Sequence, residues 1–412
     1  MKNKSVSLVG KGYWLPFVLI TFFFFLWGFA RAILDVLNPF FQQTFQINKT
    51  QASLIQFVTY MAYFLMAIPA GIFIRRQGTR RGVVTGLIAF GGAAMAFVLS
   101  RFVGDYIFYF YLLLLFVIGC GLACLEVAAN PYVTLLGDPR TSASRINRAQ
   151  SFNGLGCIFG SLLGGAYCFS TENPNISAPY IFIGIAVLLI AILFSRMKLP
   201  EFVTVEATET SESKPLVRRP MFIFGLFALF CYEVAEIAIN TFFINYATEN
   251  NMAQWISTFI ESLSGAVLNP HFIASIVLSV GLFLFMLGRF AGSWIMSRVR
   301  AERVLLWCAI GTVSTTALVV ADIYIVSFVA SILIFVFESI MFPTIFALSI
   351  RGLWSLTQKA SAVLMMTPIG GAVGTILMGM AADSRNMTFS FFVPLIAFIV
   401  ILIYSLFIRK RL

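Results

Sequence analysis

The sequence predicts an all-α membrane protein with about twelve transmembrane helices in two six-helix halves. Of its 412 residues, 60% are hydrophobic and 11% are charged, which is too little charge to cover the surface of a soluble domain. Apolar runs of roughly 20 residues, long enough to cross about 30 Å of hydrocarbon, recur from Trp14 to Arg409. Because these runs are continuously apolar, they predict helices and exclude a barrel of alternating strands.

The twelve predicted spans are bounded by Pro, Gly and clusters of polar or charged residues. Each span has the length of a membrane crossing, and most of the connections are short. The predicted spans are 14–41, 52–74, 82–100, 107–136, 146–169, 178–196, 220–248, 272–297, 302–320, 323–350, 360–381 and 388–409.

One long polar stretch divides the chain. Residues 197–219 are rich in Glu, Ser and Thr, a composition typical of a linker. We therefore expect an N-terminal six-helix half of residues 1–196, a cytoplasmic linker of 197–219 and a C-terminal six-helix half of 220–412.

Basic residues alternate between the two sides of the predicted membrane. They precede the first span, follow every even-numbered span and end the chain, whereas the odd-numbered loops hold only Lys49, Arg101 and Arg385. Basic loops stay in the cytoplasm, so we expect both termini there. The net charge of +11 reflects this topology and does not indicate nucleic-acid binding.

A weak internal repeat relates the two halves. The motif E-x-x-x-N-P at 126–131 in the fourth span is echoed by E-x-x-x-F-P at 338–343 in the tenth. The first and seventh spans share a fainter echo, N-P-F-F at 38–41 against N-T-F-F at 240–243. Repeated halves with a substrate site between them are typical of transporters that work by alternating access.

Ionisable residues inside spans cost about 2.5–3.5 kcal/mol each at a helix centre, so each needs a reason. Glu126 lies near the middle of the fourth span, with Asn130 one turn away on the same face. A carboxylate and an amide so spaced can hydrogen-bond adjacent hydroxyl groups of a sugar. Burial disfavours the charged carboxylate, so Glu126 can exchange a proton near neutral pH. A packing role, with a partner on another helix, is the alternative.

The first span holds a second acid. Asp35 follows Arg31 by one helical turn, so the two can form a structural salt bridge or Asp35 can exchange protons. We favour proton exchange for Asp35, because a merely structural pair is expensive in lipid. Trp27, two turns before Asp35, can stack on the apolar face of a sugar ring or face lipid.

Amides in the fifth and seventh spans are further candidates for sugar binding. Gln150 and Asn153 lie three residues apart on one face, followed by several glycines that permit close helix packing. These amides suit a neutral polyol, or they hold helices together. In the seventh span Glu236 can line a cavity with Asn240 or pair with Arg289 of the eighth.

No cofactor or metal site is predicted. The six cysteines all lie in apolar spans, which indicates neither a disulfide framework nor a zinc site. The sequence has no phosphate-binding loop of the Walker type, so a proton gradient is the most economical energy source. With a single histidine, His271, and no acid cluster of metal-binding spacing, a membrane-embedded enzyme is disfavoured.

Four motifs along the chain carry a family resemblance. They are F-F-L-W-G at 24–28, G-C-G-L-A-C-L-E-V-A-A-N-P at 119–131, R-I-N-x-A-Q-S-F-N at 145–153 and G-R-F-A-G-x-W at 288–294. Together with Asp35, they resemble the L-fucose:proton symporters of the major facilitator superfamily, over essentially the whole chain. The resemblance implies the major facilitator fold and cotransport of a hexose with a proton.

The resemblance also implies roles for particular residues. Asp35 is the acid of the first helix, Glu126 is the acid that links protonation to sugar binding, and Gln150 and Asn153 are among the polar sugar contacts. The expected partners are a small sugar, L-fucose first, a proton and the lipid bilayer, with no nucleic acid. We expect the chain to function as a monomer.

The sequence departs from the symporter pattern at two places. Arg31 and Ala32 replace an asparagine pair before the helix-one acid. In the seventh span, Glu236 stands where the symporter has glutamine, and Glu233 is an added acid. The sugar is therefore open, with glucose, galactose and N-acetylglucosamine as alternatives to L-fucose. A proton-driven exporter is less favoured, because a drug cavity would be mostly apolar and would not place amides beside the acids.

Overall fold

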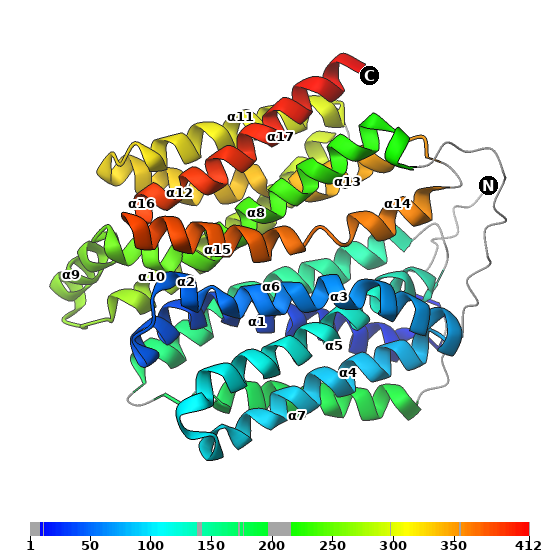
Figure 1. Cartoon of the computed structure of the whole chain (residues 1–412), viewed down its shortest axis with the longest axis horizontal. Coiled ribbons are helices and arrows are strands. Elements are labelled where there is room, and N and C mark those ends of the chain that lie inside the picture. The colour runs from blue at the N-terminus through cyan, green and yellow to red at the C-terminus, as the bar shows by residue number, and fades with distance from the viewer. Residues whose placement is uncertain are drawn as a thin grey trace. The chain divides into compact units, whose positions relative to one another are not determined.

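The computed structural model describes residues 9–10, 12–137, 142–171, 174–175, 177–196, 216–296, 298–353 and 356–411. Within these ranges all regular structure is helical, which confirms the all-α class (Figure 1). Eleven of the described helical segments have the length and hydropathy of a bilayer crossing, and Ile369–Ser384 is a shorter apolar helix.

The described helices follow the predicted spans, with extra short helices between them. The helices are α1 (Trp14–Phe45), α2 (Lys49–Ala52), α3 (Leu54–Gln77), α4 (Thr79–Ala96), η1 (Phe97–Phe102), η2 (Gly104–Tyr106), α5 (Ile107–Leu135), α6 (Ser142–Ser170), α7 (Ser177–Arg196), η4 (Leu216–Arg218), α8 (Pro220–Glu249), α9 (Met252–Ser264), α10 (Pro270–Met296), α11 (Ala301–Val320), α12 (Tyr324–Glu338), α13 (Met341–Ile350), α14 (Thr357–Leu364), α15 (Ile369–Ser384), α16 (Met387–Ser390) and α17 (Phe392–Arg411).

The helices pack into two compact units, and α1, α3 and α6 contribute residues to both. One end of each of these three helices packs with the C-terminal helices within unit 2. Unit 1 is Met1–Ile33, Met61–Gly160 and Asn173–Val205, and unit 2 is Leu34–Tyr60, Ser161–Glu172 and Glu206–Leu412.

In unit 1, the backbones of α1 and α6 lie in close contact. A Cβ atom at Gly28 would collide with the Asn153 backbone, and one at Gly156 would collide with the Phe25 carbonyl. Only glycine allows this approach, which confirms that glycines of the fifth predicted span serve close packing. On the other side of unit 1, α4 packs against both α5 and α7.

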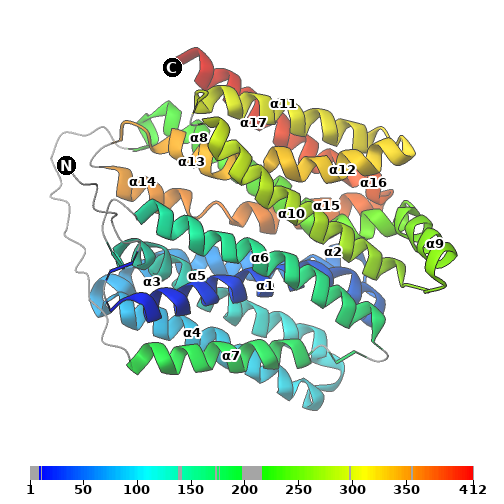
Figure 2. The ribbon, with the colours of Figure 1, turned by 180° about the vertical axis from the view of Figure 1, so that it is seen from behind.

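Unit 2 is built around α8. Every residue of α8 from Cys231 to Thr248 is buried, so the helix has no lipid-facing side over that stretch. It packs against α10, α13, α15 and α17, and Figures 1 and 2 show these helices running beside it. A side chain on this part of α8 must therefore find its partners on neighbouring helices.

A proline interrupts each of two predicted spans, the tenth and the eleventh. Pro343 has no N–H to donate to the Ser339 carbonyl, and the tenth span divides there into α12 and α13. Pro368 likewise cannot donate to the Leu364 carbonyl, and the eleventh span divides into α14 and α15. The spans predicted at 323–350 and 360–381 therefore each consist of two helical pieces, and the pieces of the tenth span together have the length and hydropathy of one bilayer crossing.

The connection between the seventh and eighth spans contains a helix that the sequence pattern did not predict. This helix, α9, begins after Asn251, which adopts a left-handed conformation with φ of 61°. Ala253 and Ser257 are buried, whereas Trp255, Phe259 and Leu263 form an exposed apolar stripe at four-residue spacing. At 13 residues α9 is too short to cross a bilayer.

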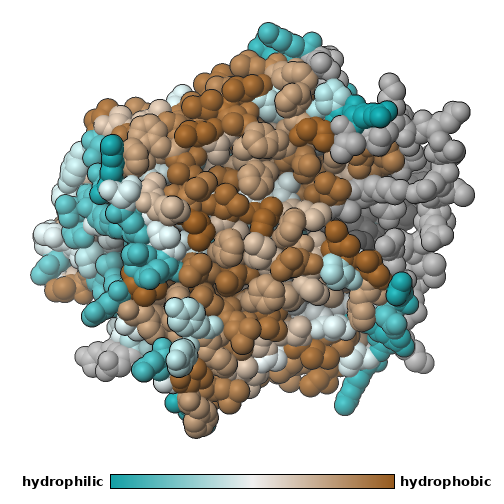
Figure 3. Space-filling view, viewed as in Figure 1, coloured by the Kyte–Doolittle hydropathy of each residue, from teal (hydrophilic) through white to brown (hydrophobic). Residues whose placement is uncertain are grey.

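Large apolar side chains are exposed in stripes along the outer helices. On α17 they are Phe392, Ile396, Ile399 and Ile403, at the three- and four-residue spacing of one helix face. On the face seen in Figure 3, hydrophobic residues occupy a broad zone and hydrophilic residues gather towards helix ends. These exposed apolar faces are suited to hydrocarbon, as the composition predicts.

Candidate functional site

The predicted site residue Trp27 lies on α1 in unit 1 and is half-buried. Its indole N–H donates a hydrogen bond to the Tyr63 hydroxyl of α3, with 3.0 Å between Nε1 and Oη. The ring also packs against Phe24, with centroids 5.6 Å apart. The polar edge of Trp27 is therefore held by protein. Tyr63 is a neighbour that the sequence pattern did not reveal.

Glu126 and Arg31 interact in unit 1. Both side chains are half-buried, and the guanidinium charge of Arg31 on α1 acts on the Glu126 carboxylate on α5. From the sequence, Arg31 was predicted either to contact the sugar or to pair with Asp35. Its interaction with Glu126 is a third role. The side chain of Asn130, the predicted neighbour of Glu126, lies outside the described part of the structure.

The two predicted amides of the fifth span lie on α6, and both are half-buried. Asn153 Nδ2 donates to the Phe24 carbonyl of α1 at 3.1 Å, beside the point where Gly28 and Gly156 bring the two backbones together. This contact holds α1 against α6. One function of Asn153 is therefore structural.

Asp35 lies on the part of α1 that belongs to unit 2, with 8% of its surface exposed. Its Oδ1 accepts a hydrogen bond from Thr241 Oγ1 of α8 at 3.2 Å. One residue before Asp35, the Leu34 carbonyl accepts a bond from Gln56 Nε2 of α3 at 3.0 Å. Asp35 therefore lies where three helices are joined by polar contacts.

Glu236 and Asn240 are brought together on one face of α8. Asn240 Nδ2 donates to Glu236 Oε1 at 3.3 Å. Asn240 is 5% exposed and Glu236 is 7% exposed. Among the described residues, the buried Asn240 Oδ1 has no hydrogen-bond partner. An unpaired buried acceptor costs about 1–3 kcal/mol, so a donor group of a ligand would be stabilising at this position.

Tyr232, on the same helix, has a buried side chain within the electrostatic field of four charged residues. Arg289 of α10 is one of them, and its Nε donates to the Ser339 carbonyl at 3.1 Å. That carbonyl is the acceptor that Pro343 leaves without a helical N–H. Arg289 thus supports the break in the tenth span. The four charged residues are Glu233, Glu236, Arg289 and Glu338.

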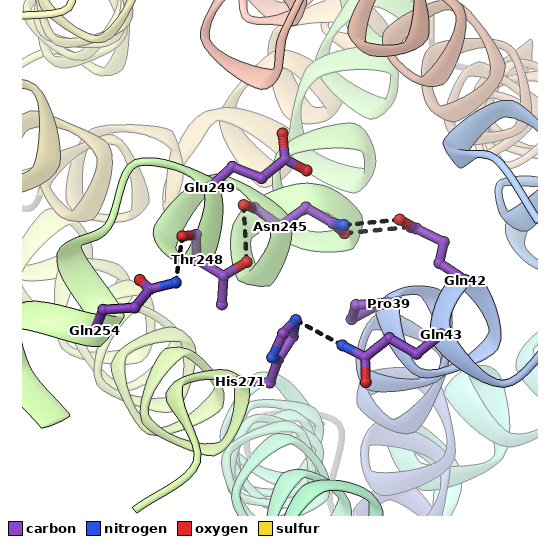
Figure 4. A pocket seen from close by; sticks show the side chains of 8 residues that line it. All are labelled: Pro39, Gln42, Gln43, Asn245, Thr248, Glu249, Gln254 and His271. Atoms are coloured by element: carbon purple, nitrogen blue, oxygen red, sulfur yellow. Dashed lines mark hydrogen bonds between the residues drawn. The ribbon is translucent and has the colours of Figure 1, made fainter. Parts of the chain in front are cut away.

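A polar pocket of about 360 Å³ lies in unit 2 at the end of α1 beyond Asp35 (Figure 4). Gln42 and Asn245 exchange amide hydrogen bonds across it, the shorter at 2.9 Å, and Gln43 Nε2 lies 2.7 Å from His271 Nε2. Gln42 and Gln43, which follow Asp35 on the same helix, lie beyond the end of the first predicted span and were not among the predicted site residues. The pocket is lined by Pro39, Gln42, Gln43, Asn245, Thr248, Glu249, Gln254 and His271.

Beside this pocket, Asp383 at the end of α15 caps the N-terminus of α2. Its carboxylate accepts bonds from the backbone N–H groups of Lys49 and Thr50, at 3.1 and 2.9 Å, and from the Thr50 hydroxyl at 2.6 Å. Lys49 Nζ also lies 3.0 Å from the Glu249 carboxylate of α8. A negative charge suits a helix N-terminus, where backbone donors are unsatisfied.

Asp383→Ala is expected to lower the thermal unfolding temperature of the purified protein in detergent. The substitution removes all three of these hydrogen bonds, and loss of a helix cap costs about 0.5–2 kcal/mol. Asp105→Ala is the matched control, because Asp105 is an exposed residue of η2. Equal unfolding temperatures for the two variants would contradict a stabilising cap.

Comparison with known proteins places the chain in a family. The family model described as Major Facilitator Superfamily matches residues 20–353. The chain belongs to this superfamily. It is 32% identical over 407 residues to a glucose/galactose transporter of Brucella abortus, covering 96% of this chain and 94% of that protein. It is 31% identical over 430 residues to the L-fucose-proton symporter of Escherichia coli, with the same two coverages.

Among solved structures, the major facilitator transporter FucP in an outward conformation is similar along its whole length. The identity is 30%, the TM-score is 0.68, and the alignment covers 96% of this chain and 99% of FucP. The predicted major facilitator fold and the resemblance read from the motifs at 119–131 and 145–153 are thereby confirmed. The relatives are transporters, in agreement with the expectation that this chain is not an enzyme.

Proposed function

We propose that this chain imports L-fucose, or a closely related hexose, together with a proton across the cytoplasmic membrane of a bacterium. Both termini face the cytoplasm, because the basic residues gather on the even-numbered side of the predicted spans. The chain works by alternating access, as a monomer in the lipid bilayer.

The proposal is carried by the pairing of a buried acid with a buried amide on α8. In unit 2, Glu236 and Asn240 share a hydrogen bond and leave the buried Asn240 Oδ1 to accept a bond from a ligand. In unit 1, Glu126 on α5 and Gln150 on α6 lie in the two motifs, at 119–131 and 145–153, that resemble those of the L-fucose:proton symporters. Carboxylates and amides together bind the hydroxyl groups of a sugar, whereas a cavity for apolar compounds would have few such groups.

The proposed cycle assigns separate roles to these residues. Asp35 and Glu126 take up the proton, which removes buried charge and favours sugar binding. Loss of the proton to the cytoplasm then releases the sugar. Moving one proton across 100 mV supplies about 2.3 kcal/mol, enough for roughly fifty-fold accumulation. The proposed sugar contacts are Trp27, Arg31, Glu126, Asn130, Gln150, Asn153, Glu236 and Asn240.

Glucose or galactose is the second candidate substrate. One relative with nearly full-length similarity is described as a glucose/galactose transporter, and its identity to this chain is as high as that of the L-fucose-proton symporter. The two departures from the symporter pattern, Arg31 and Glu236, are charged groups at proposed sugar contacts, where they can change which hydroxyl groups are bound.

Proteoliposomes that contain the purified protein are expected to accumulate labelled L-fucose when the outside is acidified. Unlabelled L-fucose, D-glucose, D-galactose and N-acetylglucosamine, added in turn as competitors, rank the sugars by the uptake that each one blocks. Empty vesicles are the control. Uptake equal to that of empty vesicles for L-fucose but not for galactose would exclude the first substrate and support the second.

A further inference from the structure

Thr241 differs from several other buried threonines of this protein in where its hydroxyl group is directed. The hydroxyls of Thr59, Thr248 and Thr375 each donate to the carbonyl four residues earlier in their own helix, at 2.8–2.9 Å. Thr241 Oγ1 donates instead to Asp35 Oδ1 on another helix. Thr241 has no exposed surface, so water cannot replace this bond without a rearrangement of the helices.

The Thr241–Asp35 bond joins the two halves predicted from the sequence. Asp35 belongs to the first span and Thr241 to the seventh, and both lie in unit 2, where residues 34–60 pack with the C-terminal helices. In a transporter that works by alternating access, the two halves separate at one end and then at the other. The bond is therefore present when α1 and α8 pack together at this end, and it breaks when they part.

The strength of this bond depends on the charge of Asp35. A hydroxyl group that donates to an ionised carboxylate makes a hydrogen bond about twice as strong as one to a neutral acceptor. When Asp35 is protonated, the Thr241 hydroxyl can turn to the Ile237 carbonyl, four residues earlier, as the other threonines do. The bond thus stabilises ionised Asp35 only while α1 and α8 are together.

We propose that Thr241 is a positioning residue for proton coupling: its hydroxyl ties loss of the Asp35 proton to the arrangement in which α1 and α8 pack together. Proton release is favoured in that arrangement, and proton uptake is favoured when the helices part. The inference rests on the proposed function, since it requires Asp35 to exchange a proton.

Several other groups near α1 carry charge or can titrate, so a change of pH alone does not isolate Asp35. Thr241 itself has no titratable group, and substitutions there leave all the others in place. Helices α3, α6, α8 and α10 contact this part of α1 in unit 2, and α2 follows α1 along the chain. Within unit 2, the charged or titratable groups on these helices besides Asp35 are Lys49, Tyr60, Tyr167, Cys168, Cys231, Tyr232, Glu233, Glu236, Tyr246, Glu249, His271 and Arg289, and Arg31 precedes Asp35 by one turn on α1.

The test compares Thr241→Val, Thr241→Ser and a control, Thr375→Val, in proteoliposomes of the full chain. Val keeps the shape of Thr but has no hydroxyl, Ser keeps the hydroxyl, and Thr375 bonds only within its own helix α15. Labelled L-fucose and labelled D-galactose are assayed separately. Two rates are measured for each sugar: exchange at equal pH on both sides, and accumulation with the outside acidified.

Thr241→Val is expected to keep sugar exchange and to lower proton-driven accumulation by about tenfold, the effect of one charge-assisted hydrogen bond on an equilibrium. Thr241→Ser and Thr375→Val are expected to match the unmodified protein in both assays. Should Thr241→Val not reach the membrane folded, Thr241→Ala removes the same hydroxyl with less bulk.

Accumulation by Thr241→Val at the unmodified rate would overturn the inference. Equal losses of accumulation in Thr241→Val and Thr375→Val would also overturn it, because they indicate a general packing defect. So would a loss of both exchange and accumulation in Thr241→Val. Failure of the proposed function is recognised separately, from the unmodified protein. In that case the unmodified protein would transport neither sugar, or would transport sugar without any response to the pH gradient.

Discussion

Glu126→Gln is expected to retain sugar exchange and to lose proton-driven accumulation completely. Glutamine has nearly the shape of glutamate and can still hydrogen-bond a hydroxyl group, but it has no exchangeable proton at physiological pH. Without a proton to carry, the pH gradient no longer acts on the sugar, and the internal concentration rises only to the external one. Accumulation then falls from roughly fifty-fold to none at 100 mV.

The measurement compares gradient-driven uptake with exchange at equal pH for the same preparation. Glu261→Gln is the matched control, because Glu261 is an exposed residue of α9 and the chemical change is the same. Gradient-driven accumulation that persists in Glu126→Gln would assign proton coupling to another acid, with Asp35 the next to test.

Gly156→Val is expected to prevent stable folding of unit 1. The added Cβ would collide with the Phe25 carbonyl and approach the Phe29 amide nitrogen at 2.9 Å, and both are backbone atoms that cannot rotate away. Overpacking of an interior typically costs about 1–3 kcal/mol, and a clash with the backbone of α1 exceeds that range. α1 and α6 would have to move apart, which also breaks the bond from Asn153 to α1.

Gly71→Val is the control for this substitution. Gly71 lies within α3, and a Cβ built there has no atom within 4 Å, so the two variants share the change in helix propensity but not the collision. The yield of monodisperse protein extracted in detergent, and its thermal unfolding, measure the difference. Equal yields would mean that α1 and α6 do not approach as closely as described.

Most of the fold could be predicted from hydropathy, because each bilayer crossing imposes a length of apolar sequence that is visible along the chain. The first span was predicted at 14–41, and the helix is Trp14–Phe45. The prediction ended too early because Gln42 and Gln43 are polar and lower the hydropathy of the last turn. The breaks at Pro343 and Pro368 had a visible cause, but proline is tolerated within membrane helices, so its presence alone does not predict a break.

The helix α9 could not be predicted from the same signal. Its stretch is short and mixes Ser, Thr and Glu with apolar residues, so it resembles a loop when the average hydropathy is considered. Only the four-residue spacing of Trp255, Phe259 and Leu263 indicates a helix. Thirteen residues are too few for a bilayer crossing, so this helix has no hydropathy signal of the kind that marks a span.

For the candidate site, the sequence identified residue types but not their partners. Glu236 and Asn240 are one turn apart on a single helix, so their contact follows from helix geometry. The bonds from Trp27 to Tyr63 and from Thr241 to Asp35 join residues 36 and 206 positions apart, and they depend on how neighbouring helices are rotated. No pattern within one helix contains that information. The cost of ionisable residues inside spans and the motif resemblance both indicated Asp35 and Glu126, but neither gave any indication of Thr241.

The division of the eleventh span between α14 and α15 affects how this part of the chain can bend. From Met366 to Gly371 the backbone N–H groups, apart from the missing one of Pro368, bond to carbonyls three residues earlier, so the tighter turns keep each donor paired. Hydrocarbon offers no replacement partner, and an ordinary helix could bend sharply only by exposing unpaired groups. In residues 366–371 the hydrogen bonds are thus already arranged for a change of direction between the two parts of the span, and the bend exposes no unpaired donor there to hydrocarbon.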